Sequence, residues 1–139
     1  MSDKHKPLVM VIDPDPKTST SLLPLLDAEG YRAVSCSAIG RSLTSVLRQH
    51  PDLVIVGKKM ENCDGMIVIG RIKEISPDTR VILLVDSEDW PSFIDALEAG
   101  ADDLQRRRPG ERALLESARR LLDSVIDPKA ERGLELRAN

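Results

Sequence analysis

Aromatic side chains are scarce in this sequence of 139 residues, which has one Trp, one Tyr and one Phe. Proteins that bind single-stranded nucleic acid usually stack the bases on aromatic side chains, so this scarcity argues against that function. The formal net charge of −3 also lacks the positive excess typical of general nucleic-acid binding. We therefore expect no nucleic-acid partner.

Cysteine and long apolar runs are equally limited. The two cysteines, Cys36 and Cys63, match neither a metal-ligand spacing nor a disulfide framework. No stretch approaches the roughly 20 apolar residues that a membrane helix needs, and the N-terminal apolar run is too short for a secretory signal. We therefore expect reduced thiols, no membrane association and a cytoplasmic location.

Short apolar runs bounded by turn signals at residues 9–12, 53–56 and 81–85 predict three strands. Two shorter strands are expected at 31–35 and 104–106. Segments with helical spacing of apolar residues alternate with them, at 16–29, 42–49, 66–75, from about 90 to 99, and 111–125. Such alternation predicts a doubly wound α/β domain, in which helices cover both faces of a parallel sheet.

The length fits one domain, which we place at residues 8–126, between a leader of 1–7 and a polar tail of 127–139. The apolar runs at 9–12, 53–56 and 81–85 are unbroken, so these strands should be central and buried on both faces. Pro24 falls inside the first predicted helix. Because proline removes a helical hydrogen bond, we expect a kink or a split there.

Several segments resemble bacterial response-regulator receiver domains, and together they span about residues 8–125. The segments are PDLVIVGKKMENCDG at 51–65, VMVIDPDP at 9–16, DAEGYRAV at 27–34 and DALEAGADDL at 95–104. The resemblance implies a flavodoxin-like fold with strand order 2-1-3-4-5. In such sheets, ligand sites lie at the carboxyl ends of the strands.

The chain departs from the family pattern where the family does its chemistry. In that family, two acids after the first strand hold Mg²⁺, and an Asp after the third strand accepts a phosphoryl group. A Thr or Ser after the fourth strand and a Lys after the fifth then hold the phosphate. Here Asp13 matches the first acid, but Pro14, Gly57 and Val85 stand at the second acid, the acceptor and the hydroxyl, and Arg107 stands at the Lys. Glycine has no nucleophile and proline no ligand atom in its side chain, so the resemblance implies a degenerate receiver, or pseudo-receiver.

The retained acids have two possible roles each. Asp13 could be a metal ligand, but we favour a solvated acid that pairs with an arginine, and we expect no tight Mg²⁺ site. Asp15 fits the cap of the first helix better than a ligand. Asp52 and Asp64 are candidate substitute phosphoacceptors, although positions before a strand and in a turn explain them equally well.

Basic residues follow the third and fifth predicted strands. Lys58 and Lys59 follow one, and Arg106, Arg107 and Arg108 follow the other. They could form an anion site at the sheet edge, although solvated charges are the simpler interpretation.

For Arg107, or Arg106 if the alignment shifts by one, we predict a partly exposed ion pair with Asp13 or Asp86. Trp90, the single Trp, is either a core residue or an anchor for a partner.

The function predicted from these residues is that of a stand-alone signalling module of two-component type, not an enzyme, that works without phosphorylation. It would bind a protein partner, such as a histidine kinase, or form a homodimer, through the face made by the fourth and fifth helices. Two alternatives stay open: a receiver phosphorylated on another Asp, and a sensor of small anions or nucleotides that uses the basic loops.

Overall fold

The computed structural model describes residues 6–36, 39–59, 64–86, 93–107 and 110–126. Five strands alternate with five helices in these residues. The strands are β1 (Leu8–Ile12), β2 (Arg32–Cys36), β3 (Leu53–Gly57), β4 (Arg80–Val85) and β5 (Asp103–Arg106). The helices are α1 (Pro16–Ala28), α2 (Ile39–Gln49), α3 (Gly65–Ile75), α4 (Phe93–Ala99) and α5 (Glu111–Ile126).

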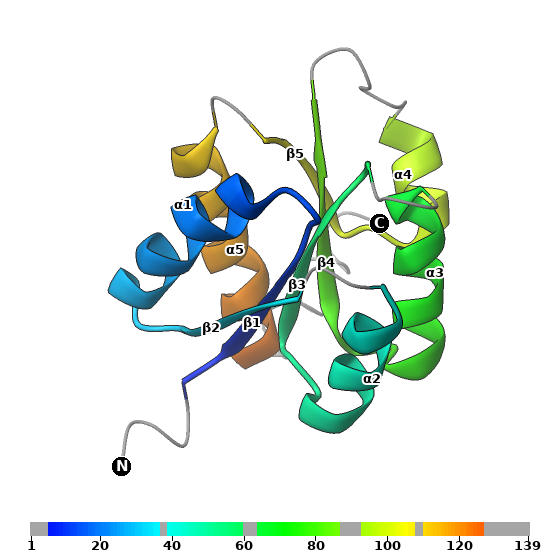
Figure 1. The fold of residues 1–139 in the computed structure, drawn as a ribbon, viewed down its shortest axis with the longest axis horizontal. Helices are drawn as coiled ribbons and strands as arrows, with labels where there is room; N and C mark the ends of the chain where they lie inside the picture. Colours follow the sequence, from blue (N-terminus) through cyan, green and yellow to red (C-terminus); the bar gives the residue numbers. More distant parts are fainter. Residues whose placement is uncertain (1–5, 37–38, 60–63, 87–92, 108–109, 127–139) are drawn as a thin grey trace, which may run out of the picture.

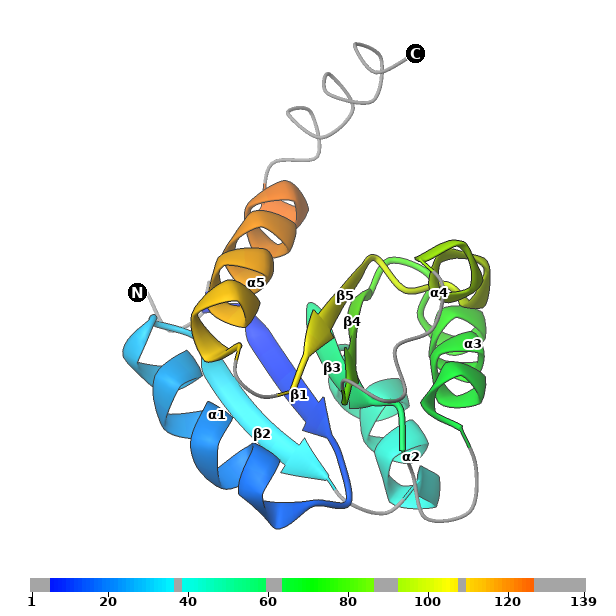
Figure 2. The same cartoon turned by 90° about the horizontal axis from the view of Figure 1, so that it is seen from above.

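The strands form one sheet in the order β2-β1-β3-β4-β5, and every neighbouring pair is parallel. Figure 1 shows α1 and α5 on one face of the sheet and α2, α3 and α4 on the other, and Figure 2 shows the same two layers from above. The predicted fold class and strand order are confirmed. Within the described residues, no helix is both long enough and apolar enough to cross a bilayer.

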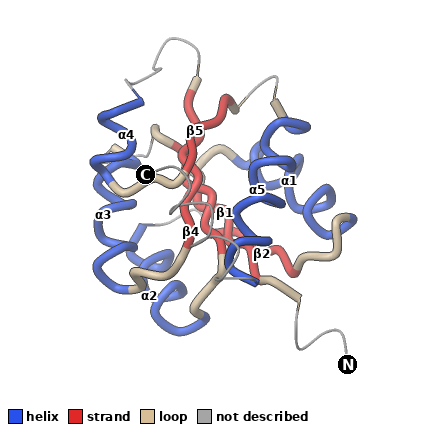
Figure 3. The backbone as a smooth tube through the Cα atoms, turned by 180° about the vertical axis from the view of Figure 1, so that it is seen from behind, coloured by secondary structure: helices blue, strands red, loops and turns tan. Residues whose placement is uncertain are grey.

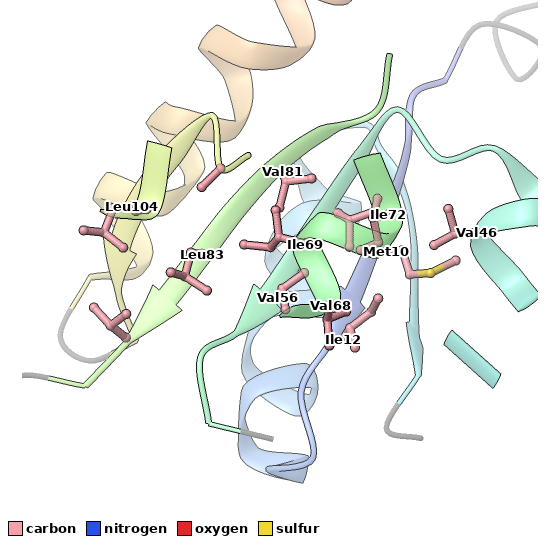
Figure 4. Close-up of a cluster of buried hydrophobic side chains, with 14 residues drawn as sticks. Met10, Ile12, Val46, Val56, Val68, Ile69, Ile72, Val81, Leu83 and Leu104 are labelled. Carbon is pink, nitrogen blue, oxygen red and sulfur yellow. The ribbon is translucent and has the colours of Figure 1, made fainter. Parts of the chain in front are cut away.

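The sheet separates two apolar cores, and alternate residues of each central strand enter opposite ones. In β3, Leu53 and Ile55 pack with the helices α1 and α5. Val54 and Val56 pack on the other face, in the core that Figure 4 shows. Because both faces are covered, the apolar runs need no polar alternation, and the predicted burial of β1, β3 and β4 is confirmed.

Helix α2 begins at Ile39, three residues before the predicted start. Helix α1 is one helix through Pro24, so the predicted split is absent, while the alternative, a kink, stays a prediction. Its buried side chains Leu22 and Leu26 flank the proline, while Pro24 and Thr20 lie among exposed residues. Packing therefore holds both halves together, and the carbonyl that the proline leaves unpaired belongs to a residue on the solvent side.

All five strands run in the same direction, so their carboxyl ends lie at one edge of the sheet. Figure 3 shows from behind that the strands lie between the helices α2, α3 and α4 on one side and α1 and α5 on the other. Asp13 follows β1 at this edge, Gly57 ends β3, Asp86 follows β4 and Arg107 follows β5. The family-like positions singled out in the sequence therefore meet at one place.

Candidate functional site: an arginine among carboxylates

Asp13 is the centre of this edge and is a buried acid. Its side chain is 1% exposed, so the expectation of a solvated carboxylate was wrong. One oxygen, Oδ1, accepts a hydrogen bond from the backbone N–H of Asp15 at 3.0 Å. The other, Oδ2, lies 2.6 Å from Nη1 of Arg107. Both carboxylate oxygens are therefore engaged by the chain itself.

Arg107 follows β5, and its side chain reaches Asp13 at the end of β1, although β4 and β3 lie between these two strands. Its backbone N–H donates to the carbonyl of Val85 at 2.9 Å, which fixes the residue beside the end of β4. From there its side chain extends over the ends of β4 and β3 toward β1, across strands that lie about 4.8 Å apart. The predicted ion pair between Arg107 and Asp13 is confirmed. It is not partly exposed as expected, because the arginine side chain is only 9% exposed.

Three further oxygens surround the guanidinium. Nη1 donates to Oγ1 of Thr18 at 3.2 Å and lies 3.8 Å from Oδ2 of Asp15. Nε lies 3.4 Å from Oδ1 of Asp86, also as an ion pair. Within the described part of the chain, neither Nε of Arg107 nor Oδ2 of Asp13 has a partner with hydrogen-bond geometry. Charge attraction therefore dominates these contacts.

Gly57 makes room for this arrangement. A Cβ atom built on Gly57 would lie 2.7 Å from Oδ2 and 2.8 Å from Cγ of Asp13, and 3.1 Å from Nη2 of Arg107. Real Cβ atoms essentially never approach heavy atoms within 3.0 Å. The acid and the arginine thus occupy the volume that any side chain at position 57 would enter first.

The other family-like positions also lack reactive atoms here. Pro14 is half-buried and supplies no side-chain ligand. Val85 is fully buried and packs in the core on the α3 and α4 side of the sheet. With Arg107 placed among the carboxylates of this edge, no group of three His, Cys, Asp or Glu side chains in the described residues is arranged to hold a metal ion.

The two candidate substitute acceptors have structural roles. Asp52 lies at the opposite, amino edge of the sheet, where Oδ2 accepts from the backbone N–H of Leu8 at 2.9 Å. Asp64 caps α3 by accepting from the N–H of Met66 at 2.9 Å, and its other oxygen pairs with Nζ of Lys58 at 2.9 Å. Asp15 is the cap of α1, as predicted, and accepts from the N–H of Lys17 at 2.9 Å.

Two of the basic residues that were predicted to form an anion site pair with different acids of the chain. Lys58 turns toward Asp64, and Arg107 turns toward Asp13. Lys59 and Arg106 are exposed. Arg108 lies outside the described residues, and so does Trp90, so neither the complete basic cluster nor the partner role of Trp90 is tested, and both stay predictions.

A polar cluster between β5 and α5 was missed by the sequence analysis. The hydroxyl of buried Ser117 donates to Oδ2 of Asp103, to which Arg120 and Gln105 also donate. Burial acts to raise the pKa of Asp103, but the hydrogen bonds from Ser117 and Gln105 and the charge of Arg120 outweigh it and lower that pKa. The sequence held one signal for this cluster: the polar residue Ser117 lies between Leu114 and Ala118, on the inward face of α5.

Helix α4 presents apolar side chains to solvent. Phe93, Ile94 and Leu97 are 58%, 67% and 46% exposed, and α4 also carries the exposed acids Asp95 and Glu98. Three large apolar side chains exposed on one short helix make α4 a candidate surface for binding a partner.

Comparisons with known proteins agree with this fold. A family model described as "Response regulator receiver domain" matches residues 9–119. The C4-dicarboxylate transport transcriptional regulatory protein DctD of Pseudomonas aeruginosa is 30% identical over 115 residues, which are 83% of this chain and 25% of that protein. This chain spans a quarter or less of the first curated relatives that it matches.

Two solved structures show the same similarity. A response regulator from Thermotoga maritima is 27% identical, with a TM-score of 0.75 over 86% of this chain and 99% of that one. A CheY-like receiver domain protein from Methanospirillum hungatei JF-1 has a TM-score of 0.78 over 86% of this chain and 95% of that one. At 21% identity, the second match supports the fold alone.

Proposed function

This chain belongs to the response regulator receiver domain family, and on that premise we propose that it is a two-component signalling module that works without being phosphorylated. The observation that supports this proposal is the buried pair of Asp13 and Arg107, which lies over Gly57. This pair fills the place in which a phosphoacceptor side chain would have to stand.

Phosphoryl transfer has two chemical requirements. A nucleophilic oxygen must lie in line with the phosphorus, and cations must neutralise the charge that develops on the transferred group. Gly57 has no side-chain oxygen, and Val85 has methyl groups in place of a hydroxyl. Asp13 is already paired with a cation of the chain itself. The nucleophile and its supporting groups are therefore absent together, and we propose no enzymatic activity.

Phosphorylation of another Asp has less support. Asp64 comes between β3 and α3, but both of its carboxylate oxygens are engaged. Oδ2 pairs with Lys58, and Oδ1 accepts the N–H of Met66 at the start of α3. Asp52 lies at the other end of the sheet. A small-anion sensor also has less support, because the buried cation Arg107 is surrounded by carboxylates that would repel an anion.

We propose that the output is binding to a protein partner, such as a histidine kinase or another signalling protein, through α4. Phe93 and Ile94 expose more than half of their surface, which makes them candidate anchors in an interface core. A second copy of the chain is the other candidate occupant of this surface.

Incubation of the chain with acetyl phosphate and Mg²⁺, followed by intact-mass measurement, tests independence of phosphorylation. We expect no phosphoryl adduct, whereas a receiver that has its acceptor Asp, treated in parallel, should be labelled. An adduct on most of the chain would refute the proposal, and peptide mapping would then show whether Asp52 or Asp64 carries it.

Binding of a partner through α4 is tested with the double variant Phe93→Ser/Ile94→Ser, and Ile67→Ser serves as the control. Ile67 is 59% exposed but belongs to α3. Partners captured from the native host by the unmodified chain should be lost with the α4 variant and retained with the control. Retention by the α4 variant would exclude α4 as the anchor, and light scattering of the free chain would reveal a homodimer.

A further inference from the structure

We propose that Arg107 is a tethered cation that neutralises the acid cluster of Asp13, Asp15 and Asp86 in place of a metal ion. The inference rests on the family membership of the chain and goes beyond independence of phosphorylation. It concerns what holds this edge of the sheet together, and it would stand even if a different Asp were phosphorylated.

The charges of this cluster converge on one cation. The three acids come from the end of β1, the cap of α1 and the end of β4, and one guanidinium lies within 4 Å of all three. The nearest contact, 2.6 Å to Asp13, is made with the most buried carboxylate of the cluster. A charge with that little exposure is costly to keep ionised unless an opposite charge lies beside it.

The cluster does not fit a metal ion while Arg107 is present. Mg²⁺, which the family implies at this edge, binds oxygen ligands at about 2.0–2.1 Å in near-octahedral geometry. Oδ1 of Asp13 already accepts an N–H, and Oδ2 already faces the guanidinium. A metal ion would have to displace Arg107 to reach the one carboxylate that most needs a cation. The positive charge at this edge therefore comes from an arginine of the chain, whereas the family resemblance implies a bound Mg²⁺.

Arg107 is a permanent cation of this edge. A bound metal ion leaves when its concentration falls, whereas an arginine that follows β5 in the chain cannot diffuse away. Its contacts join the ends of β5, β4 and β1 and the first turn of α1, where Thr18 accepts a hydrogen bond. This edge should therefore keep one arrangement whether or not Mg²⁺ is present, as expected of a module without a phosphorylation switch.

The test compares Arg107→Met with Arg106→Met, which removes the same charge from the exposed neighbouring residue. Melting temperatures are measured in millimolar MgCl₂ and in NaCl of equal ionic strength. Arg107→Met should melt well below the unmodified chain and gain several degrees from Mg²⁺, because a divalent cation can then enter the acid cluster. The unmodified chain and Arg106→Met should show no specific response to Mg²⁺.

A second variant separates charge from packing. In Asp13→Asn/Arg107→Met both members of the pair are neutral, so the melting temperature should recover substantially and the response to Mg²⁺ should disappear. If Arg107→Met does not fold, a folded double variant supports the proposal and an unfolded one contradicts it.

The proposal is also overturned if Arg107→Met is as stable as the unmodified chain, if Mg²⁺ fails to stabilise it, or if Mg²⁺ stabilises the unmodified chain equally. None of these measurements involves phosphorylation, so they stand apart from the labelling test.

Discussion

Replacement of Gly57 by alanine adds one methyl group to the most crowded point of the site. The new Cβ would lie 2.7 Å from Oδ2 and 2.8 Å from Cγ of Asp13. Asp13 cannot yield freely, because its carboxylate is buried and held by the N–H of Asp15 and by Arg107. The methyl group should therefore force the carboxylate away and weaken its contact with the guanidinium.

The change in the free energy of unfolding is the difference between two opposing effects. Overpacking of a well-packed interior by a methyl group costs about 1–3 kcal/mol. Alanine is itself better than glycine inside a strand by about 0.5–1 kcal/mol. Because the built Cβ lies within 3.0 Å of two atoms of Asp13, the overpacking cost should fall in the upper part of its range, at about 2–3 kcal/mol. We therefore expect Gly57→Ala to lower the free energy of unfolding by about 1–2.5 kcal/mol, the difference between the two effects.

Gly70→Ala is the matched control. Gly70 lies inside α3, and a Cβ there would meet no atom of the described residues within 4 Å. Alanine is favoured over glycine in a helix by about 0.8–1.0 kcal/mol, so this variant should be stabilised by about that amount.

Urea unfolding followed by far-UV circular dichroism measures both variants, and the two changes should have opposite signs. The reasoning would be refuted if Gly57→Ala were as stable as the unmodified chain, since the crowding over Gly57 would then be absent in solution.

Two further predictions concern acids away from the site. Asp103 has a lowered pKa, against a reference value of 3.8, so its ionised form is favoured in the folded state and adds stability. The advantage of the unmodified chain over Asp103→Asn should be complete above about pH 4 and disappear as the pH falls through the lowered value; a difference independent of pH would contradict this. Asp102 pairs with Nζ of Lys73 at 2.9 Å and with Arg80 at 3.6 Å. Asp102→Ala should therefore lose about 1–3 kcal/mol in urea unfolding, and a variant within about 0.5 kcal/mol of the unmodified chain would show that these contacts contribute little.

The strands were predictable because their apolar runs and turn residues agree with their packing. Leu53 to Val56 is apolar on both sides of the strand, which is only compatible with a covered sheet. Helix α2 was harder, because Gly40 reads locally as a helix breaker and Ser42 as a cap. The structure places Gly40 in the first turn of the helix, which begins at Ile39, so the helix starts before the serine that reads as its cap.

The candidate site was predictable in its pairing but not in its burial. Opposite charges at the ends of β1 and β5 indicated that Arg107 and Asp13 could meet. That the pair is buried, with Thr18 as a further acceptor, depends on side-chain conformations and on the room above Gly57. Spacing in a sequence does not encode such close contacts.

The central claim is that this site has lost more than its nucleophile, and repair of the acceptor tests it most directly. Gly57→Asp supplies a carboxylate, but the volume there is filled by Asp13 and Arg107, Pro14 offers no metal ligand and Val85 no hydroxyl. With acetyl phosphate and Mg²⁺, the account predicts at most trace phosphoryl adduct on Gly57→Asp in an intact-mass spectrum, and more on the triple variant that adds Pro14→Asp and Val85→Thr. An adduct on most of the single variant would contradict the account, because the missing acceptor would then be the only defect.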